Sequence, residues 1–135
     1  MASYTKFESF VEAICEEKHN LASDQLTVAL CNASNNPTAA DAVLGDLTEI
    51  SYTNLSSRNI TTTSSSETDG TYSLVVEDLV LTASGAVAAF RYVVIYNDDA
   101  PSDELVCFFD YGSEVELADG ETFTIDFGAS LFTLA

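Results

Sequence analysis

The side chains that could do chemistry in this sequence are one histidine, three cysteines and 22 carboxylates. His19 could act as a general base, but it follows Lys18 at the predicted end of a helix, which is typical of a helix-end residue. Cys15 falls on the apolar face of the same predicted helix, which favours packing over nucleophilic catalysis. The sequence has no nucleophile elbow, metalloprotease motif or phosphate-binding glycine loop. We therefore predict no catalytic residue and a protein that is not an enzyme.

The carboxylates give no specific signal for a glycosidase or a metal site. Pairs of Asp and Glu are so frequent that no catalytic pair stands out, and the chain has no Trp to stack on a sugar. Asn97, Asp98, Asp99 and Asp103 place hard oxygen ligands on one predicted loop, but the spacing of an EF-hand is missing. We interpret these acids as a solvated loop and predict no metal and no cofactor.

The overall charge excludes two classes of partner. The chain has 135 residues with 4 Lys and Arg against 22 Asp and Glu, a formal net charge of −18. A surface this negative repels phosphate, so we predict no binding to nucleic acid or to anionic membranes. No Lys or Arg follows Arg91, and we expect one strongly negative region. Three interpretations remain open for it: a solvated face, a docking surface for a basic partner or cations, and an adaptation to high salt.

Length and hydrophobicity indicate one folded domain over residues 1–135. At 47% hydrophobic residues the chain is too apolar for a disordered protein, and a single core suits its length. Residues 1–10 lack the features of a secretory signal, and no apolar run approaches the roughly 20 residues that span a bilayer. We expect neither standard secretion nor a membrane anchor. Cys15, Cys31 and Cys107 form no zinc or disulfide pattern and are predicted to be buried thiols.

Only the N-terminal segment has helical periodicity. Apolar residues recur at spacings of three and four along residues 5–18, and the opposite face is polar. Thr5 and Glu8 fit a capping box, in which each side chain accepts a hydrogen bond from a backbone N–H at the helix start. We predict a helix over residues 5–18. Its apolar face comprises Phe7, Phe10, Val11, Ile14 and Cys15.

After the helix the hydrophobic period changes to two, which is typical of strands. Residues 25–30 predict a half-buried strand, and residues 43–52 fit either a short strand or a turn of helix. Asp69-Gly70 is a strong signal for a two-residue hairpin turn, because both residues tolerate positive φ. Residues 60–68 and 71–82 are therefore predicted to pair, and the first of these strands, rich in Ser and Thr, is predicted to be exposed.

An apolar run follows over residues 87–96 and predicts a central strand. Arg91 interrupts it, and because a buried Arg must be paired, we expect a structural ion pair with a carboxylate. Residues 105–109 predict another strand, which ends at a bend over residues 110–112.

The last third of the chain predicts a closing hairpin. Residues 115–117 are expected to face residues 123–127 across the turn Ala118-Asp119-Gly120, and residues 131–134 to add a final edge strand. One helix and many short strands without βαβ alternation predict a mainly β fold. We expect an antiparallel β-sandwich, jelly-roll-like, of about eight or nine strands with one N-terminal α-helix.

Eight segments, in the same order along nearly the whole chain, carry a resemblance. They are F-x-x-F-V-E-A (7–13), S-D-Q-L-T-V-A-L (23–30), T-E-I (48–50), D-G-T-Y-S-L-V (69–75), L-T-A-S-G (81–85), F-R-Y-V-V-I-Y-N-D (90–98), F-D-Y-G-S (109–113) and D-G-E-T-F-T-I-D-F (119–127). Together they resemble a family of small structural proteins of tailed bacteriophages. The resemblance implies a virion component, a decoration or cement protein that binds the capsid exterior and stabilises the shell.

The resemblance also implies a partner, an assembly and a location. The partner would be the major capsid protein, the assembly a homotrimer by analogy with other small decoration proteins, and the location the outside of a virion assembled in the host cytoplasm. The family has no catalytic residues to carry over. Tyr4, Lys6 and Phe7 are our candidate capsid contacts, because a chain end with apolar and basic groups suits that role.

Two alternatives remain within the binding and structural classes. The first is a tail, neck or head-fibre component of the virion. The second is a module that binds a glycan or protein of the host surface, with tyrosine rings as stacking platforms. The tyrosines considered are Tyr52, Tyr72, Tyr92, Tyr96 and Tyr111.

Overall fold

The computed structural model describes residues 2–135, which form nine strands, one α-helix and one 3₁₀ turn. The elements, in order, are β1 (Ser3–Lys6), α1 (Ser9–Cys15), β2 (Leu26–Cys31), the 3₁₀ turn Leu44–Asp46, β3 (Thr62–Thr68), β4 (Thr71–Val76), β5 (Leu79–Thr82), β6 (Val87–Asn97), β7 (Leu105–Leu117), β8 (Thr122–Ile125) and β9 (Phe132–Leu134). The prediction of a mainly β protein with one N-terminal helix is confirmed.

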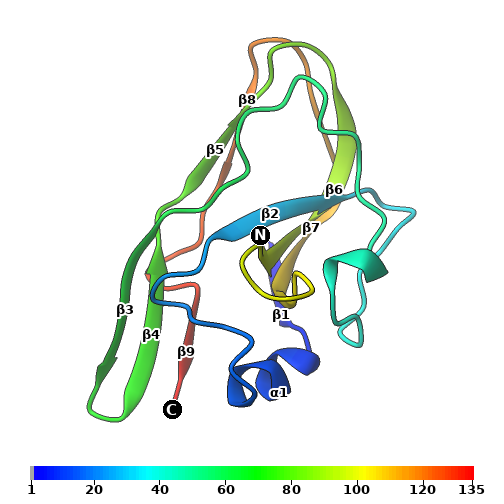
Figure 1. The fold of residues 1–135 in the computed structure, drawn as a ribbon. Coiled ribbons are helices and arrows are strands. Elements are labelled where there is room, and N and C mark those ends of the chain that lie inside the picture. The colour runs from blue at the N-terminus through cyan, green and yellow to red at the C-terminus, as the bar shows by residue number, and fades with distance from the viewer. Residues whose placement is uncertain (1) are drawn as a thin grey trace.

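The strands form three antiparallel sheets. The largest has the order β1-β7-β6-β2, and the others have the orders β3-β4-β9 and β5-β8. In Figure 1 the β3–β4 hairpin projects at the lower left with β9 beside it, and β5 and β8 run side by side at the top. Residues 2–135 close no barrel, and the arrangement is sandwich-like.

The main core involves all three sheets. Leu26, Val28 and Leu30 of β2 belong to the same buried cluster as Leu74 of β4 and Ile125 of β8. Alternate residues along a strand point to one face, so β2 contributes every second side chain to this cluster. Burial of these apolar groups is the main stabilising term of the fold.

A second cluster lies on the opposite face of the large sheet. Ala29 and Cys31 of β2 pack there with Phe7, and Leu44 and Leu47 cover the cluster from outside. Strand β2 is therefore buried on both faces. The prediction of a half-buried strand over residues 25–30 is wrong in this respect. The sequence pattern gave no sign of this because the covering residues come from a segment with little regular structure.

The helix begins later than predicted. Residues 3–6 form strand β1, in which Thr5 pairs with Phe108 of β7, and helix α1 covers only Ser9–Cys15. Glu8 is the N-cap residue and makes no side-chain capping bond, so the predicted capping box is absent from the described structure. The backbone of residues 3–6 instead pairs with residues 107–110 of β7, about a hundred residues away in sequence.

Helix α1 ends in a left-handed residue. The Lys18 N–H donates to Ala13 O (2.9 Å) and the Glu17 N–H to Ile14 O (3.4 Å), the two bonds of a Schellman motif, with Glu17 at φ 61°. Left-handed backbone costs an L-residue about 1–2 kcal/mol and costs glycine little. We expect Glu17→Gly to raise the free energy of unfolding by about 0.5–1 kcal/mol in denaturant titrations. A loss of stability would contradict this account of the helix end.

The predicted hairpin at Asp69-Gly70 is confirmed. β3 and β4 pair across it, and both turn residues have positive φ (51° and 84°). The predicted closing hairpin is wrong, because β8 pairs with β5 and not with β7. Leu117 instead pairs with Val87 of β6. The turn residues fix where the chain reverses, but long-range packing decides which strand it joins.

Candidate functional site

An apolar hollow lies where β1 and α1, near the N-terminus, approach β9, near the C-terminus. Side chains of β1, α1 and β9 enclose a groove of about 470 Å³, which we call the terminal groove. It is lined by Tyr4, Lys6, Phe10, Val11, Ile14, Cys15, Leu131, Phe132, Thr133 and Leu134. A second hollow, of about 790 Å³, adjoins it and shares Ile14, Phe132 and Leu134.

The terminal groove collects most of the exposed large hydrophobic side chains. Of the four in residues 2–135, Tyr4 (42% exposed), Val11 (50%) and Leu134 (53%) line this groove. The fourth, Val80 (49% exposed), lies on β5 and lines neither hollow. Single exposed apolar residues are normal on a protein surface, but several gathered in one concave site indicate a binding surface.

Regular structure positions each wall of the groove. Phe10 is buried in the first turn of α1. Its ring packs edge to face on that of Phe132 of β9, with the ring centroids 5.2 Å apart. This contact leaves Val11 and Ile14, on the neighbouring helix positions, facing the groove. Strand β9 is held by pairing with β4, and no further strand joins its other side or that of β1 in the described sheets.

The structure separates the three predicted capsid contacts. Tyr4 and Lys6 line the terminal groove, but Phe7 is completely buried and packs on Phe108 with ring centroids 5.2 Å apart. The expected exposure of Phe7 is therefore wrong, because residues of a strand end alternate between faces and Phe7 faces the second core. Tyr4 packs on Phe109 at 5.5 Å, and burial raises the pKa of its phenol, with a further contribution from the Cys107 thiol.

The tyrosines considered as stacking platforms do not gather at one site. Tyr92 and Tyr96 are buried in the second cluster. Tyr52 is fixed by its hydroxyl, which donates to Glu49 (2.5 Å) and accepts from the Leu30 N–H (2.9 Å), and the Arg58 guanidinium covers its ring at 3.7 Å. Of the five, only Tyr72 lines either hollow of the terminal region.

Two of the three thiols are buried. Burial raises the pKa of Cys31 to about 11 and that of Cys107 to about 12, so both are protonated at neutral pH. All three cysteines are free, and Cys15, contrary to the prediction, is exposed at the groove. Residues 2–135 contain no cluster of three or more His, Cys, Asp or Glu placed to bind a metal ion.

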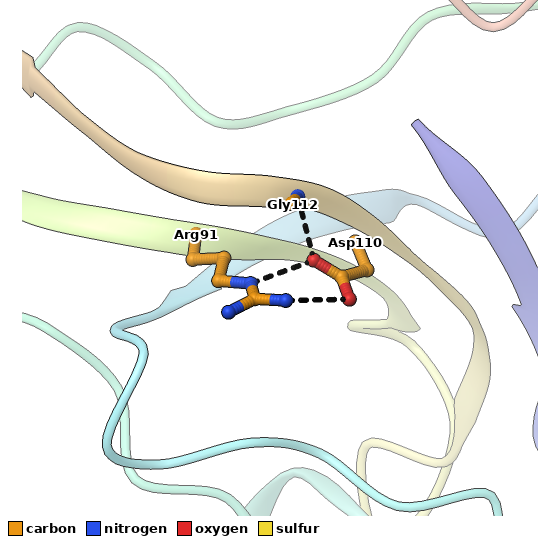
Figure 2. A network of polar contacts seen from close by, with 3 residues as sticks. All are labelled: Arg91, Asp110 and Gly112. Atoms are coloured by element: carbon orange, nitrogen blue, oxygen red, sulfur yellow. Dashed lines mark hydrogen bonds and ion pairs between the residues drawn. The ribbon is translucent and has the colours of Figure 1, made fainter. Parts of the chain in front are cut away.

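Arg91 forms the predicted ion pair, at an irregular point of the long β6–β7 pair. Figure 2 shows its guanidinium against Asp110, with Nε donating to Oδ1 (2.8 Å) and Nη2 to Oδ2 (3.2 Å), while the Gly112 N–H also donates to Oδ1 (2.8 Å). The pairs Phe90–Val115 and Tyr92–Asp110 bracket a bulge in β7. The predicted bend at residues 110–112 is thus a bulge within one continuous strand, and Arg91 is only partly buried (30% exposed).

The Asp110 contacts predict a small acid-dependent loss of stability. The Arg91 hydrogen bonds, and then the Gly112 N–H, lower the pKa of Asp110 below its ordinary 3.8. The stabilising contribution is therefore present above about pH 3.8 and is lost as the pH falls through the lower folded pKa. We expect the stability of Asp110→Asn to depend less on pH than that of the wild type below about pH 4 in denaturant titrations. Equal acid dependence in both proteins would contradict this role.

The acids that follow Arg91 lie along β7 and in the segments on either side of it. Asp98 and Asp99 lie in the loop before β7, whereas Asp119 and Glu121 lie in the turn after it, and β7 has 13 residues. Three further acids lie within β7 itself, namely Asp110, Glu114 and Glu116. The single strongly negative region stays a prediction.

Comparison with models of known protein families, with curated protein sequences and with solved structures finds no match for this chain. Among residues 2–135, no helix combines the length and apolar character that crossing a bilayer requires. The resemblance to phage structural proteins rests on the eight sequence segments alone.

Proposed function

We propose that this chain is a structural protein of a tailed-phage virion, a decoration protein that binds the head exterior through the terminal groove and stabilises the shell. The sequence segments suggest the family, and the groove supplies a docking surface. The observation that carries the proposal is the gathering of Tyr4, Val11 and Leu134 in one hollow. The jelly-roll-like connectivity expected from the strand pattern stays a prediction.

Charge next to the groove favours a different protein as the occupant, not a second copy. Glu8, Glu12 and Glu16 follow one another at four-residue spacing along α1 and are all exposed. Carboxylates at this spacing repel one another on a helix, and the ion pair found in residues 2–135 is elsewhere. A partner surface that is apolar at its centre and basic at its edge would fill the groove and relieve this repulsion. We propose that the major capsid protein presents such a surface.

The net charge of −18 also constrains how copies meet. Copies with this charge repel one another except where salt or a partner screens them. By analogy with small decoration proteins we propose a homotrimer whose contacts lie away from the groove. Light scattering on the purified protein checks this assembly. A monomer at every concentration in solution, together with single copies on the shell, would contradict it.

The location on the particle distinguishes the decoration proposal from its rivals. Particles of the phage that encodes this chain are purified on a density gradient and decorated with an antibody against it. We expect label over the head. Label on the tail or neck alone would favour the tail, neck or head-fibre alternative. Glycan-array binding by the isolated protein, together with unlabelled heads, would favour the host-surface alternative.

A further inference from the structure

A partly buried polar cluster joins the segment that follows helix α1 to the end of β6. Asn97, fully buried at the end of β6, donates from Nδ2 to Asp24 Oδ2 (2.7 Å) and lies 3.0 Å from His19 Nδ1. The Asp24 carboxylate also accepts from the Asn20 N–H (2.8 Å). These contacts attach segment 19–24 to the large sheet. His19 and Asn20 also line the second hollow next to the terminal groove.

The hydrogen bonds of Asn97 determine which state of His19 fits. Asn97 Oδ1 accepts from the Asp99 N–H (3.0 Å), and a carboxylate oxygen of Asp24 needs a donor, so the amide nitrogen must face Asp24 and His19. His19 Nδ1 then accepts a hydrogen bond, and its proton is on Nε2. Turning the amide over would break the bonds to both Asp99 and Asp24. The cluster therefore accommodates a neutral imidazole.

Two buried atoms of this neighbourhood have no hydrogen-bond partner. They are His19 Nε2, a donor in this tautomer, and Glu104 Oε2, an acceptor. Glu104 is next to Asn97 in the β6–β7 pair, because the Asn97 N–H donates to Glu104 O (3.0 Å). Each unpaired buried polar group costs free energy, so this neighbourhood is less well satisfied than a typical protein interior. A protonated imidazole would add a second donor that the present arrangement cannot satisfy.

We propose that His19, Asn97 and Asp24 form an acid-sensitive latch, which holds segment 19–24 on the sheet while His19 is neutral and releases it when His19 is protonated. Protonation places an N–H on Nδ1 opposite the Asn97 amide N–H, and two donors cannot share a hydrogen bond. Because segment 19–24 forms one wall of the second hollow, its release changes the surface beside the terminal groove.

The carboxylates near His19 stabilise its protonated form in the folded protein and so oppose release of the segment, but burial of the imidazole has the larger effect. Burial lowers the pKa of His19 below its ordinary 6.5 and outweighs the carboxylates of Glu104 and Asp24, which raise it. Helix α1 faces the imidazole with the uncharged ring of Phe10, at 5.1 Å, and Glu17 and Lys18 flank it in sequence. Since the folded pKa is the lower one, the contribution to stability is complete above pH 6.5 and is lost as the pH falls through the folded pKa.

The test uses the full chain, whose one histidine gives one imidazole signal. Carbon-13 NMR follows this signal from about pH 8 to about pH 4, and amide hydrogen exchange, corrected for intrinsic rates, follows the N–H groups of Ser23 and Asp24. Both donate to Asn20 O within the segment. We expect a His19 midpoint below 6.5 and a loss of protection at Ser23 and Asp24 that follows it. Amides of the β3–β4 hairpin are the internal reference and should not change.

Two variants separate the latch from general acid sensitivity. His19→Gln cannot be protonated, so Ser23 and Asp24 should keep the same protection at every pH. Asn97→Asp offers a carboxylate to the imidazolium, so the midpoint of His19 should rise. A wild-type midpoint at or above 6.5, or protection that stays constant while His19 titrates, would overturn the proposal.

Discussion

Phe7→Ala is expected to lower the free energy of unfolding by about 3–5 kcal/mol, the usual cost of removing a buried phenylalanine. Phe7 is fully buried, its ring packs on Phe108, and its N–H donates to Val106 O (3.2 Å). A domain of this size has a total stability of about 5–15 kcal/mol, so the variant would be close to unfolding. Denaturant titration at neutral pH measures the loss.

Lys6→Ala is the matched control for this prediction, because Lys6 precedes Phe7 in the chain and is exposed. Surface changes of this kind usually alter stability by less than about 0.5 kcal/mol. Equal stability of Phe7→Ala and Lys6→Ala would contradict the burial of Phe7 in the second core. Phe7 would then again be a candidate capsid contact.

Val11→Glu is expected to weaken binding to phage heads at least about tenfold, which corresponds to about 1.4 kcal/mol. Val11 is half-exposed in the terminal groove, so a capsid surface seated there would bury the new carboxylate without a partner. The neighbouring Glu8 and Glu12 would make the site still more negative. Heads that lack the protein, from a phage deleted for its gene, are mixed with the variant, and co-sedimentation measures binding.

Val80→Glu provides a control of the same residue type and almost the same exposure (49% against 50%) on β5, outside both hollows. It changes the net charge equally, so it corrects for any general electrostatic effect. We expect Val80→Glu to bind like the wild type. Equal losses of binding in both variants, or none in Val11→Glu, would exclude the terminal groove as the docking surface.

Local signals in the sequence predicted the parts of the fold that depend on neighbouring residues. Asp69-Gly70 determines its turn through backbone conformation, and the apolar run of β6 has few alternatives to a central strand. The ion pair of Arg91 was predictable because a charge within such a run requires a partner. Asp110 as the particular partner was not predictable, since the bulge that brings it opposite Arg91 depends on the pairing of two long strands.

Contacts between distant parts of the chain explain the wrong predictions. Residues 5 and 6 fit a helix start by pattern, yet they pair with β7 as part of β1. Strand β8 joins β5 although β7 is closer in sequence. The terminal groove depends on such contacts too. Tyr4 and Lys6 could be singled out as apolar and basic groups near a chain end, but Leu134 joins them only through the pairing of β9 with β4.

Electron cryomicroscopy of the virion tests the central claim most directly. Particles of the phage that we propose encodes this chain are imaged with and without its gene. The account predicts density on the head exterior that fits the β fold and is missing from the deleted phage, with the terminal groove against the capsid subunits and Val80 away from them. Density confined to the tail, or identical heads in both preparations, would contradict it.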